Sequence, residues 1–94
     1  MKYYYVYIIE AVRTSRNNLG KIIYYTGFTD NPNRRFREHK AGIKSKFMSN
    51  SKIIPRRIVY LEQISDYFNA LKREKQIKQM PLKKKKELIK KYAH

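Results

Sequence analysis

Apolar residues gather in three short runs along the chain, and each run predicts a β-strand. The first run, residues 3–9 (YYYVYII), consists only of aromatic or β-branched side chains, which is typical of a strand covered on both faces. A polar stretch with turn residues at 17–20 (NNLG) separates it from a second strand at 21–28. The third strand is predicted at 57–62, after a basic, weakly patterned loop. We therefore expect a small three-stranded sheet with the first strand in its interior.

The first two strands are expected to pair as a β-hairpin. If Ile9 lies opposite Ile23, then Tyr7 lies opposite Tyr25. One face of the hairpin would then carry two neighbouring phenol rings.

The first predicted helix follows the second strand. Residues 29–31 are suited to cap a helix, Pro32 is suited to its first turn, and Gly42 is suited to end it. Arg35 and His39 are four residues apart within this segment, so they lie on one face.

The second predicted helix covers 67–80, with Ser65 and Asp66 suited to cap its start, and Pro81 separates it from a third helix at 82–92. In the second helix, steps of three and four residues join Phe68, Leu71, position 74 and Ile77 into an apolar stripe. Position 74 is Glu74. A carboxylate in such a stripe costs several kcal/mol unless it is paired or binds a metal. The pattern alone leaves two interpretations of Glu74, a buried ion pair with a cation or an acid with a function.

The element order β-β-α-β-α-α predicts the α+β class, with a small three-stranded antiparallel sheet flanked by helices. Ninety-four residues suffice for one modest core, so we expect residues 1–94 to form a single domain. The sequence has no cysteine, which excludes disulfides, thiol chemistry and cysteine-ligated metal sites.

The charge balance points to a polyanionic partner. The chain has 23 Lys and Arg against 7 Asp and Glu, a formal net charge of +16. Such an excess opposes folding through self-repulsion, and a nucleic acid is the partner that it suits best. No apolar run of about 18 residues and no signal-peptide pattern is found. We therefore expect a cytoplasmic, nucleoid-associated protein, with membrane binding a distant alternative.

Several of these features together resemble the GIY-YIG nuclease family. Residues 5–7 (YVY) stand where the family has its first motif, and residues 25–27 (YTG) stand where it has its second. RRFREH and ALKREKQIK follow in the order of the family's later elements. Tyr5 replaces the Gly of the first motif, and Thr26 replaces the Ile of the second. The resemblance covers about residues 3–89 and is greatest to small single-domain bacterial members, whose roles are largely undefined.

The resemblance implies a catalytic set for phosphodiester hydrolysis. Either Tyr7 or Tyr25 would take the proton from the attacking water, and cationic neighbours would have to favour the phenolate. Arg35 would provide that charge and bond phosphate oxygens, and His39 would share in proton transfer. Taken singly, His39 is more commonly a helix-surface residue and Arg35 a solvated charge. Glu74 matches the family's metal-binding glutamate.

The resemblance also implies a divalent cofactor, Mg²⁺ or Mn²⁺. Because Glu74 is the single strong ligand candidate, we expect one ion, held weakly until nucleic acid completes its coordination shell. The other acids form no evident ligand cluster, which disfavours a two-metal site.

The expected partner is DNA, duplex or branched, and a protein partner would supply specificity. The leading interpretation is a structure- or damage-oriented DNA endonuclease of repair or recombination. The alternative is a non-catalytic or weakly catalytic module that binds DNA or RNA through the same fold. Residues expected to contact nucleic acid are Gly27, Arg34, Lys40, Lys44, Lys46, Arg56, Arg57 and Lys72, together with the lysines of 83–91. A solvated basic surface is the other interpretation of these charges.

Overall fold

The structure is a computed structural model, and it describes residues 2–14, 16–17, 19–41 and 52–92. Its elements are β1 (Tyr4–Arg13), β2 (Ile22–Thr29), α1 (Pro32–Lys40), β3 (Ile53–Ile64), α2 (Tyr67–Lys78) and α3 (Leu82–Tyr92). This order confirms the predicted α+β class. No helix within these ranges is long and apolar enough to span a membrane.

The three strands form one antiparallel sheet in the order β2-β1-β3. The central position of β1 confirms the prediction from its apolar run, and Val6, Ile8 and Ile9 are fully buried. Two strands are longer than predicted. β1 continues through a polar stretch to Arg13, and β3 begins at Ile53, within the segment expected to be a loop. Pairing between β1 and β3 extends both strands beyond their apolar parts.

The predicted hairpin register is wrong by two residues. Ile9 lies opposite Tyr25 rather than Ile23, and Tyr7 lies opposite Gly27 rather than Tyr25. The turn fixes this register, because Gly20 adopts a left-handed conformation (φ 81°) and donates its N–H to the Arg13 carbonyl. A shift of two residues keeps every side chain on its predicted face. Tyr7 and Tyr25 are therefore diagonal rather than direct neighbours.

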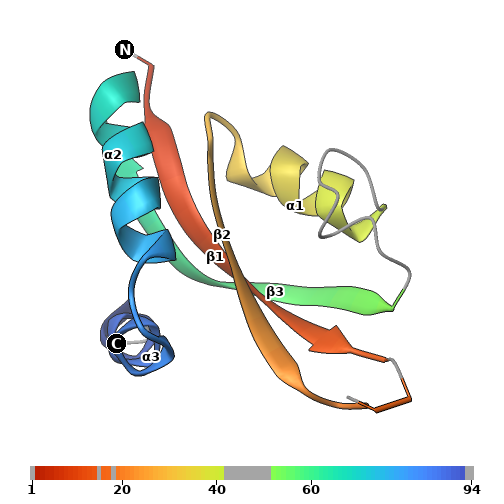
Figure 1. Cartoon of the computed structure of the whole chain (residues 1–94). Coiled ribbons are helices and arrows are strands. Elements are labelled where there is room, and N and C mark those ends of the chain that lie inside the picture. Colours follow the sequence, from red (N-terminus) through yellow and green to blue (C-terminus); the bar gives the residue numbers. More distant parts are fainter. Residues whose placement is uncertain (1, 15, 18, 42–51, 93–94) are drawn as a thin grey trace.

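Helices cover both faces of the sheet (Figure 1). On one face, Val6 and Ile8 form a core with Ala70 and Ile77 of α2, against which Leu88 of α3 also packs. On the other face, a second core contains Tyr7, Ile9, Ala11 and Ile53, with Phe36 of α1 packed against it. The alternation of β1 side chains between the two faces thus places Tyr7 on the side of α1.

The helices begin where the capping residues predict. Asn31 caps α1 and Asp66 caps α2, each accepting a hydrogen bond from the backbone N–H three residues on. The bounds of α3 match the prediction, whereas α2 ends two residues early, at Lys78.

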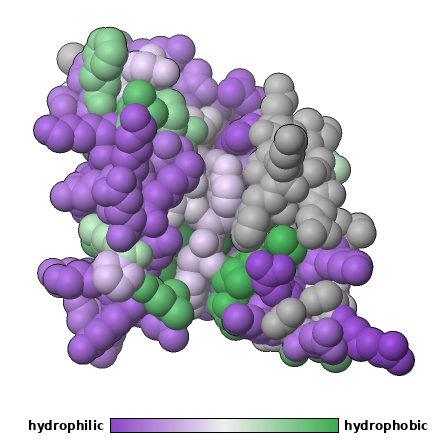
Figure 2. Space-filling model, in the orientation of Figure 1, coloured by the Kyte–Doolittle hydropathy of each residue, from purple (hydrophilic) through white to green (hydrophobic). Residues whose placement is uncertain are grey.

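One expectation for the core of α2 is wrong. Ile77 is buried as predicted and Ala70 is buried with it, but Phe68 keeps 75% of its surface exposed. Ala70 and Ile77 lie on the same side of the helix, and this side packs against the sheet. Phe68 lies on the opposite side and faces solvent. Figure 2 shows hydrophilic side chains covering the side formed by α2 and α3, with an apolar patch over the start of α2.

Candidate active site

The hydroxyl of Tyr7 is the centre of the candidate site. Tyr7 is 2% exposed, and its hydroxyl oxygen lies 2.9 Å from Nε2 of His39 on α1. Arg35, one turn earlier on α1, donates a hydrogen bond to the same hydroxyl. The predicted sharing of one face by Arg35 and His39 therefore serves to place both on a single phenol.

Tyr7 is protonated at neutral pH, and burial makes its proton harder to remove. Burial raises the pKa of Tyr7 to about 12, and the opposing hydrogen bond and positive charge of Arg35 are too weak to reverse this. The expectation that cationic neighbours would favour the phenolate is thus not met in the free protein. A phenol with this pKa can act as a base only if its own proton passes to an acceptor at the same time.

His39 is the acceptor that the structure offers. Its side chain is fully buried, contrary to the surface position that is common for such residues, and its Nδ1 has no hydrogen-bond partner among the described residues. Burial, and secondly the charge of Arg35, lower the pKa of His39 to about 4. The imidazole is therefore neutral at physiological pH and can receive a proton on Nε2.

The buried imidazole predicts a specific dependence of stability on pH. Between pH 6.5 and about 4 the unfolded chain protonates His39 and the folded chain does not, so stability falls as the pH falls through this range. The loss attributable to His39 is on the order of 3 kcal/mol by pH 4. Urea unfolding at pH 7.5 and pH 4.5 should show a steeper loss for the wild type than for His39→Gln. Equal losses in the two proteins would contradict the prediction.

Tyr25 completes the aromatic part of the site. Its ring is 5.1 Å from the His39 ring in an edge-to-face arrangement and 6.4 Å from the Tyr7 ring, measured between centroids. Tyr25 is half-buried, so it is open to solvent where Tyr7 is almost enclosed. The structure thus brings together both tyrosines that the sequence singled out, despite the corrected register.

Gly27 allows the Tyr7 ring to cross β2. A Cβ atom built on Gly27 would overlap the Tyr7 hydroxyl and would lie 2.7 Å from its Cζ, which no side chain can occupy. Gly27 was expected to contact nucleic acid, and in the structure the phenol of Tyr7 fills the space where its side chain would be. The direct pairing of Tyr7 with Gly27 is the reason, because opposite residues share a face.

Glu74 joins the site from α2. Its side chain is 12% exposed, and its nearest ion-pair partner is Lys78, at 3.8 Å between Nζ and Oε1. Its carboxylate is close enough to Tyr7 to contribute to the raised pKa of that phenol. Glu74 therefore lies at the margin of the buried face of α2, neither in the core nor directed away from the site.

Glu38 is a member of the site that the sequence analysis overlooked. Its Oε1 lies 3.6 Å from Nη1 of Arg35. The spacing of three residues in a helix was the available signal, because such pairs are neighbours on the helix surface. Glu38 restrains the guanidinium that contacts Tyr7.

The donor set fits a single, weakly held divalent ion. The described residues contain no group of three or more His, Asp or Glu side chains that could bind a metal alone. Glu74 offers one carboxylate at a partly open position, paired only at the outer limit of an ion pair. Mg²⁺ commonly uses one or two carboxylates and takes its remaining ligands from waters and phosphates. Glu74 would be the residue that holds it.

The described basic residues expected to bind nucleic acid lie on α1, β3, α2 and α3. Arg34 is paired with Asp30 (3.1 Å) and Arg57 with Glu10 (3.2 Å), while Lys40 lies over the Phe36 ring. Gly27 is buried, and Arg56 and Lys72 are exposed. Lys44 and Lys46 lie outside the described residues. Their contacts with nucleic acid stay predictions.

The chain is similar to known proteins over most of its length. The family model of the GIY-YIG catalytic domain matches residues 3–90. The chain is 38% identical over 86 residues to a UPF0213 protein of Syntrophus aciditrophicus, covering 92% of the chain and 88% of that protein. It is 36% identical over 86 residues to a UPF0213 protein of Haloquadratum walsbyi, covering 92% and 85%. No solved structure matches the chain.

Proposed function

The chain belongs to the GIY-YIG catalytic domain family, and from this premise we propose that it is a divalent-metal-dependent DNA endonuclease that acts on branched or damaged DNA in repair or recombination. One observation carries the proposal. A phenol is held by hydrogen bonds to both a guanidinium and a neutral imidazole, and a carboxylate from a different helix acts on the same phenol. These are the groups needed to activate water, stabilise a charged phosphate and hold a metal.

Tyr7 is the general base in this proposal, and His39 takes its proton. With the imidazole proton on Nδ1, Nε2 accepts the hydrogen of the Tyr7 hydroxyl. As water attacks phosphorus, Tyr7 removes the proton of the water and passes its own to His39, so no free phenolate is required. The bond from phosphorus to the leaving oxygen breaks, and that oxygen departs as an anion or takes a proton from solvent. The direct contact with His39 favours Tyr7 over Tyr25 for this role.

Arg35 and Tyr25 act on the phosphate. The guanidinium of Arg35 has donors beyond the one used on Tyr7, and these suit the non-bridging oxygens on which negative charge grows. Tyr25, which is half-buried, would donate the hydrogen of its hydroxyl to the same group. A divalent ion bound through Glu74 would supply charge stabilisation for the phosphate and the leaving oxygen.

The excess of cations supports binding to the DNA backbone. α2 carries the exposed lysines Lys72 and Lys75, and α3 carries a run of four consecutive lysines at 83–86. If binding neutralises six phosphates, the logarithm of the association constant should fall with the logarithm of salt concentration at a slope of about −5.

A binding module without catalysis is the second candidate. The net charge of +16 by itself accounts for affinity toward DNA or RNA and requires no chemistry. A protein partner would then provide the activity, and in the nuclease it would provide specificity.

A cleavage assay decides between these candidates. Labelled forks, flaps, three- and four-way junctions, nicked duplex and plain duplex are incubated with the protein in Mn²⁺, in Mg²⁺ and in EDTA. We expect cuts near the branch points with either metal and none in EDTA. Binding to all substrates without any cut would contradict the nuclease and favour the binding module. Tighter binding to matched RNA substrates would move the function to RNA.

A further inference from the structure

The outer face of α2 presents an exposed aromatic ring followed by two lysines. Phe68 is 75% exposed, and Lys72 and Lys75 follow at four and seven residues, so all three lie on one face of the helix. Neither lysine forms an ion pair with any described residue, whereas the acids at 10, 30, 38, 62 and 74 are each paired with a cation. Ring and charge on this face are therefore free to meet a ligand.

The exposed ring of Phe68 belongs to a series of edge-to-face aromatic contacts. The Phe68 ring meets the Tyr67 ring edge-on at 5.6 Å, and Tyr67 in turn contacts the rings of Tyr4 and Phe28 at the same distance. These contacts fix the start of α2 on the sheet and leave Phe68 as the outermost ring of the series. Tyr67 is itself 45% exposed, so the start of α2 presents two adjacent aromatic rings to solvent.

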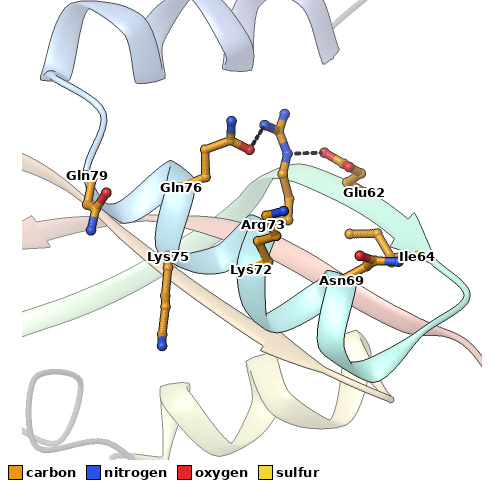
Figure 3. Close-up of a pocket in the computed structure, with 8 residues that line it drawn as sticks. All are labelled: Glu62, Ile64, Asn69, Lys72, Arg73, Lys75, Gln76 and Gln79. Atoms are coloured by element: carbon orange, nitrogen blue, oxygen red, sulfur yellow. Dashed lines mark hydrogen bonds and ion pairs between the residues drawn. The ribbon is translucent and has the colours of Figure 1, made fainter.

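A shallow groove of about 580 Å³ runs beside this face, between α2 and the end of β3. Figure 3 shows the side chains around it, with Lys75 extending away from the pair formed by Arg73 and Glu62. Nε of Arg73 lies 2.9 Å from the Glu62 carboxylate, which neutralises the one acid in the groove. Its lining residues are Glu62, Ile64, Asn69, Lys72, Arg73, Lys75, Gln76 and Gln79. The groove is therefore positively charged.

The groove also carries three carboxamides, on Asn69, Gln76 and Gln79. Gln76 already accepts a hydrogen bond from Nη1 of Arg73 at 2.8 Å. A carboxamide both donates and accepts, which is the combination that the edge of an unpaired nucleobase requires.

We propose that this face of α2 binds a single-stranded segment of DNA. One unpaired base stacks on Phe68, and Lys72 and Lys75 contact the phosphates that follow. Asn69 and Gln79 lie about 15 Å apart along the helix axis, so they reach the edges of two different bases. Stacking on an exposed ring requires a free base face, which a duplex does not offer except at its ends. The positive charge of the groove suits the DNA backbone and not another basic chain.

The position of this face relates it to the candidate active site. Six residues separate Phe68 from Glu74, which is about 9 Å along the helix axis. Glu74 also lies about 120° around the helix from Phe68, so a single-stranded arm bound on the outer face must pass around α2 to reach Glu74. The inference rests on the proposed function for its choice of DNA, and it adds the class of substrate, DNA with an unpaired arm.

Binding measured without metal tests the inference. Fluorescence anisotropy of labelled single-stranded and duplex DNA of equal length is recorded in EDTA, so no cleavage is needed. Phe68→Ala should weaken single-stranded binding about tenfold and change duplex binding less than twofold. Lys72→Gln with Lys75→Gln should lower the salt slope for single strands by about 1.4. Circular dichroism checks that each variant is folded.

Matched controls separate the surface from general effects. Leu19→Ala removes a side chain that is 77% exposed elsewhere, and it should change neither affinity. Lys83→Gln with Lys84→Gln removes the same charge from α3 and should weaken both forms of DNA equally. If Phe68→Ala weakens both forms equally, or neither, the inference is wrong. A selective loss for single-stranded RNA alone would also overturn it.

The outcome is distinguishable from failure of the proposed function. If the protein cuts no DNA but Phe68→Ala weakens its binding to single strands, the proposed surface is supported and the proposed nuclease activity is wrong. If Phe68→Ala changes neither the cleavage of branched DNA nor the affinity for single strands, the nuclease activity is supported and the proposed surface is wrong.

Discussion

Glu74→Gln is expected to abolish cleavage while the protein still binds DNA. The substitution keeps the size of the side chain and removes the charge that would hold a divalent ion. Because a metal contributes several kcal/mol of charge stabilisation in phosphoryl transfer, the cleavage rate should fall about a thousandfold. Single-turnover cleavage of a labelled branched substrate in Mn²⁺ measures the rate, and anisotropy in EDTA measures the affinity.

A control variant and a measurement of affinity separate a loss of metal binding from a loss of structure in Glu74→Gln. Glu87→Gln changes the net charge equally on an exposed position of α3 and should leave the cleavage rate within twofold. Affinity of Glu74→Gln for DNA without metal should equal or slightly exceed that of the wild type, since one negative charge is lost near the phosphate. A variant that cuts at the wild-type rate would remove Glu74 from the metal site, and a variant that no longer binds would show a structural role.

Tyr7→Phe is the second large expected effect. It deletes the hydroxyl that lies between Arg35 and His39 and keeps the ring that packs over Gly27. Loss of a general base costs about a hundredfold to ten-thousandfold in rate, and we expect about a thousandfold here. Single-turnover cleavage rates of Tyr7→Phe and Tyr25→Phe are compared, and Tyr24→Phe, on the opposite face of β2, serves as the inert control.

A double substitution tests the proton relay. If Tyr7 passes its proton to His39, the two act as a unit, and the loss in the double variant Tyr7→Phe with His39→Gln should barely exceed that of Tyr7→Phe alone. Additive losses would show that His39 acts independently. A larger loss for Tyr25→Phe than for Tyr7→Phe would assign the general base to Tyr25.

The sequence was sufficient for the order of elements and for the faces of the strands. β-branched and aromatic runs, caps at Asn31 and Asp66, and the break at Pro81 are local signals, and all were confirmed. The hairpin register was not predictable in the same way. It depends on the left-handed Gly20 and its bond to Arg13, and a shift of two residues leaves every hydrophobic pattern intact.

The candidate site shows the same division. The identities of Tyr7, Tyr25, Arg35, His39 and Glu74 came from the resemblance to the GIY-YIG family. The structure groups the first four around the Tyr7 hydroxyl and brings the charge of Glu74 within reach of it. Their chemistry required the tertiary structure. Burial of His39 and Tyr7 shifts both pKa values away from the usual range, and no local pattern reveals that Gly27 makes room for a phenol. The wrong prediction that Phe68 is part of the core has the same origin. A helix can rotate about its axis and bury a neighbouring set of side chains without any change in the periodicity of its sequence.

The division of the site between the two ends of the chain has a consequence for synthesis of the protein. Tyr7, Tyr25, Arg35 and His39 all lie within β1, β2 and α1, whereas Glu74 comes from α2, after β3 has crossed the sheet to pair with β1. A nascent polypeptide on the ribosome therefore lacks Glu74, the proposed acidic ligand, until β1, β2, α1 and β3 have all been translated. If that ligand is essential, truncated products released early are unable to nick the genome.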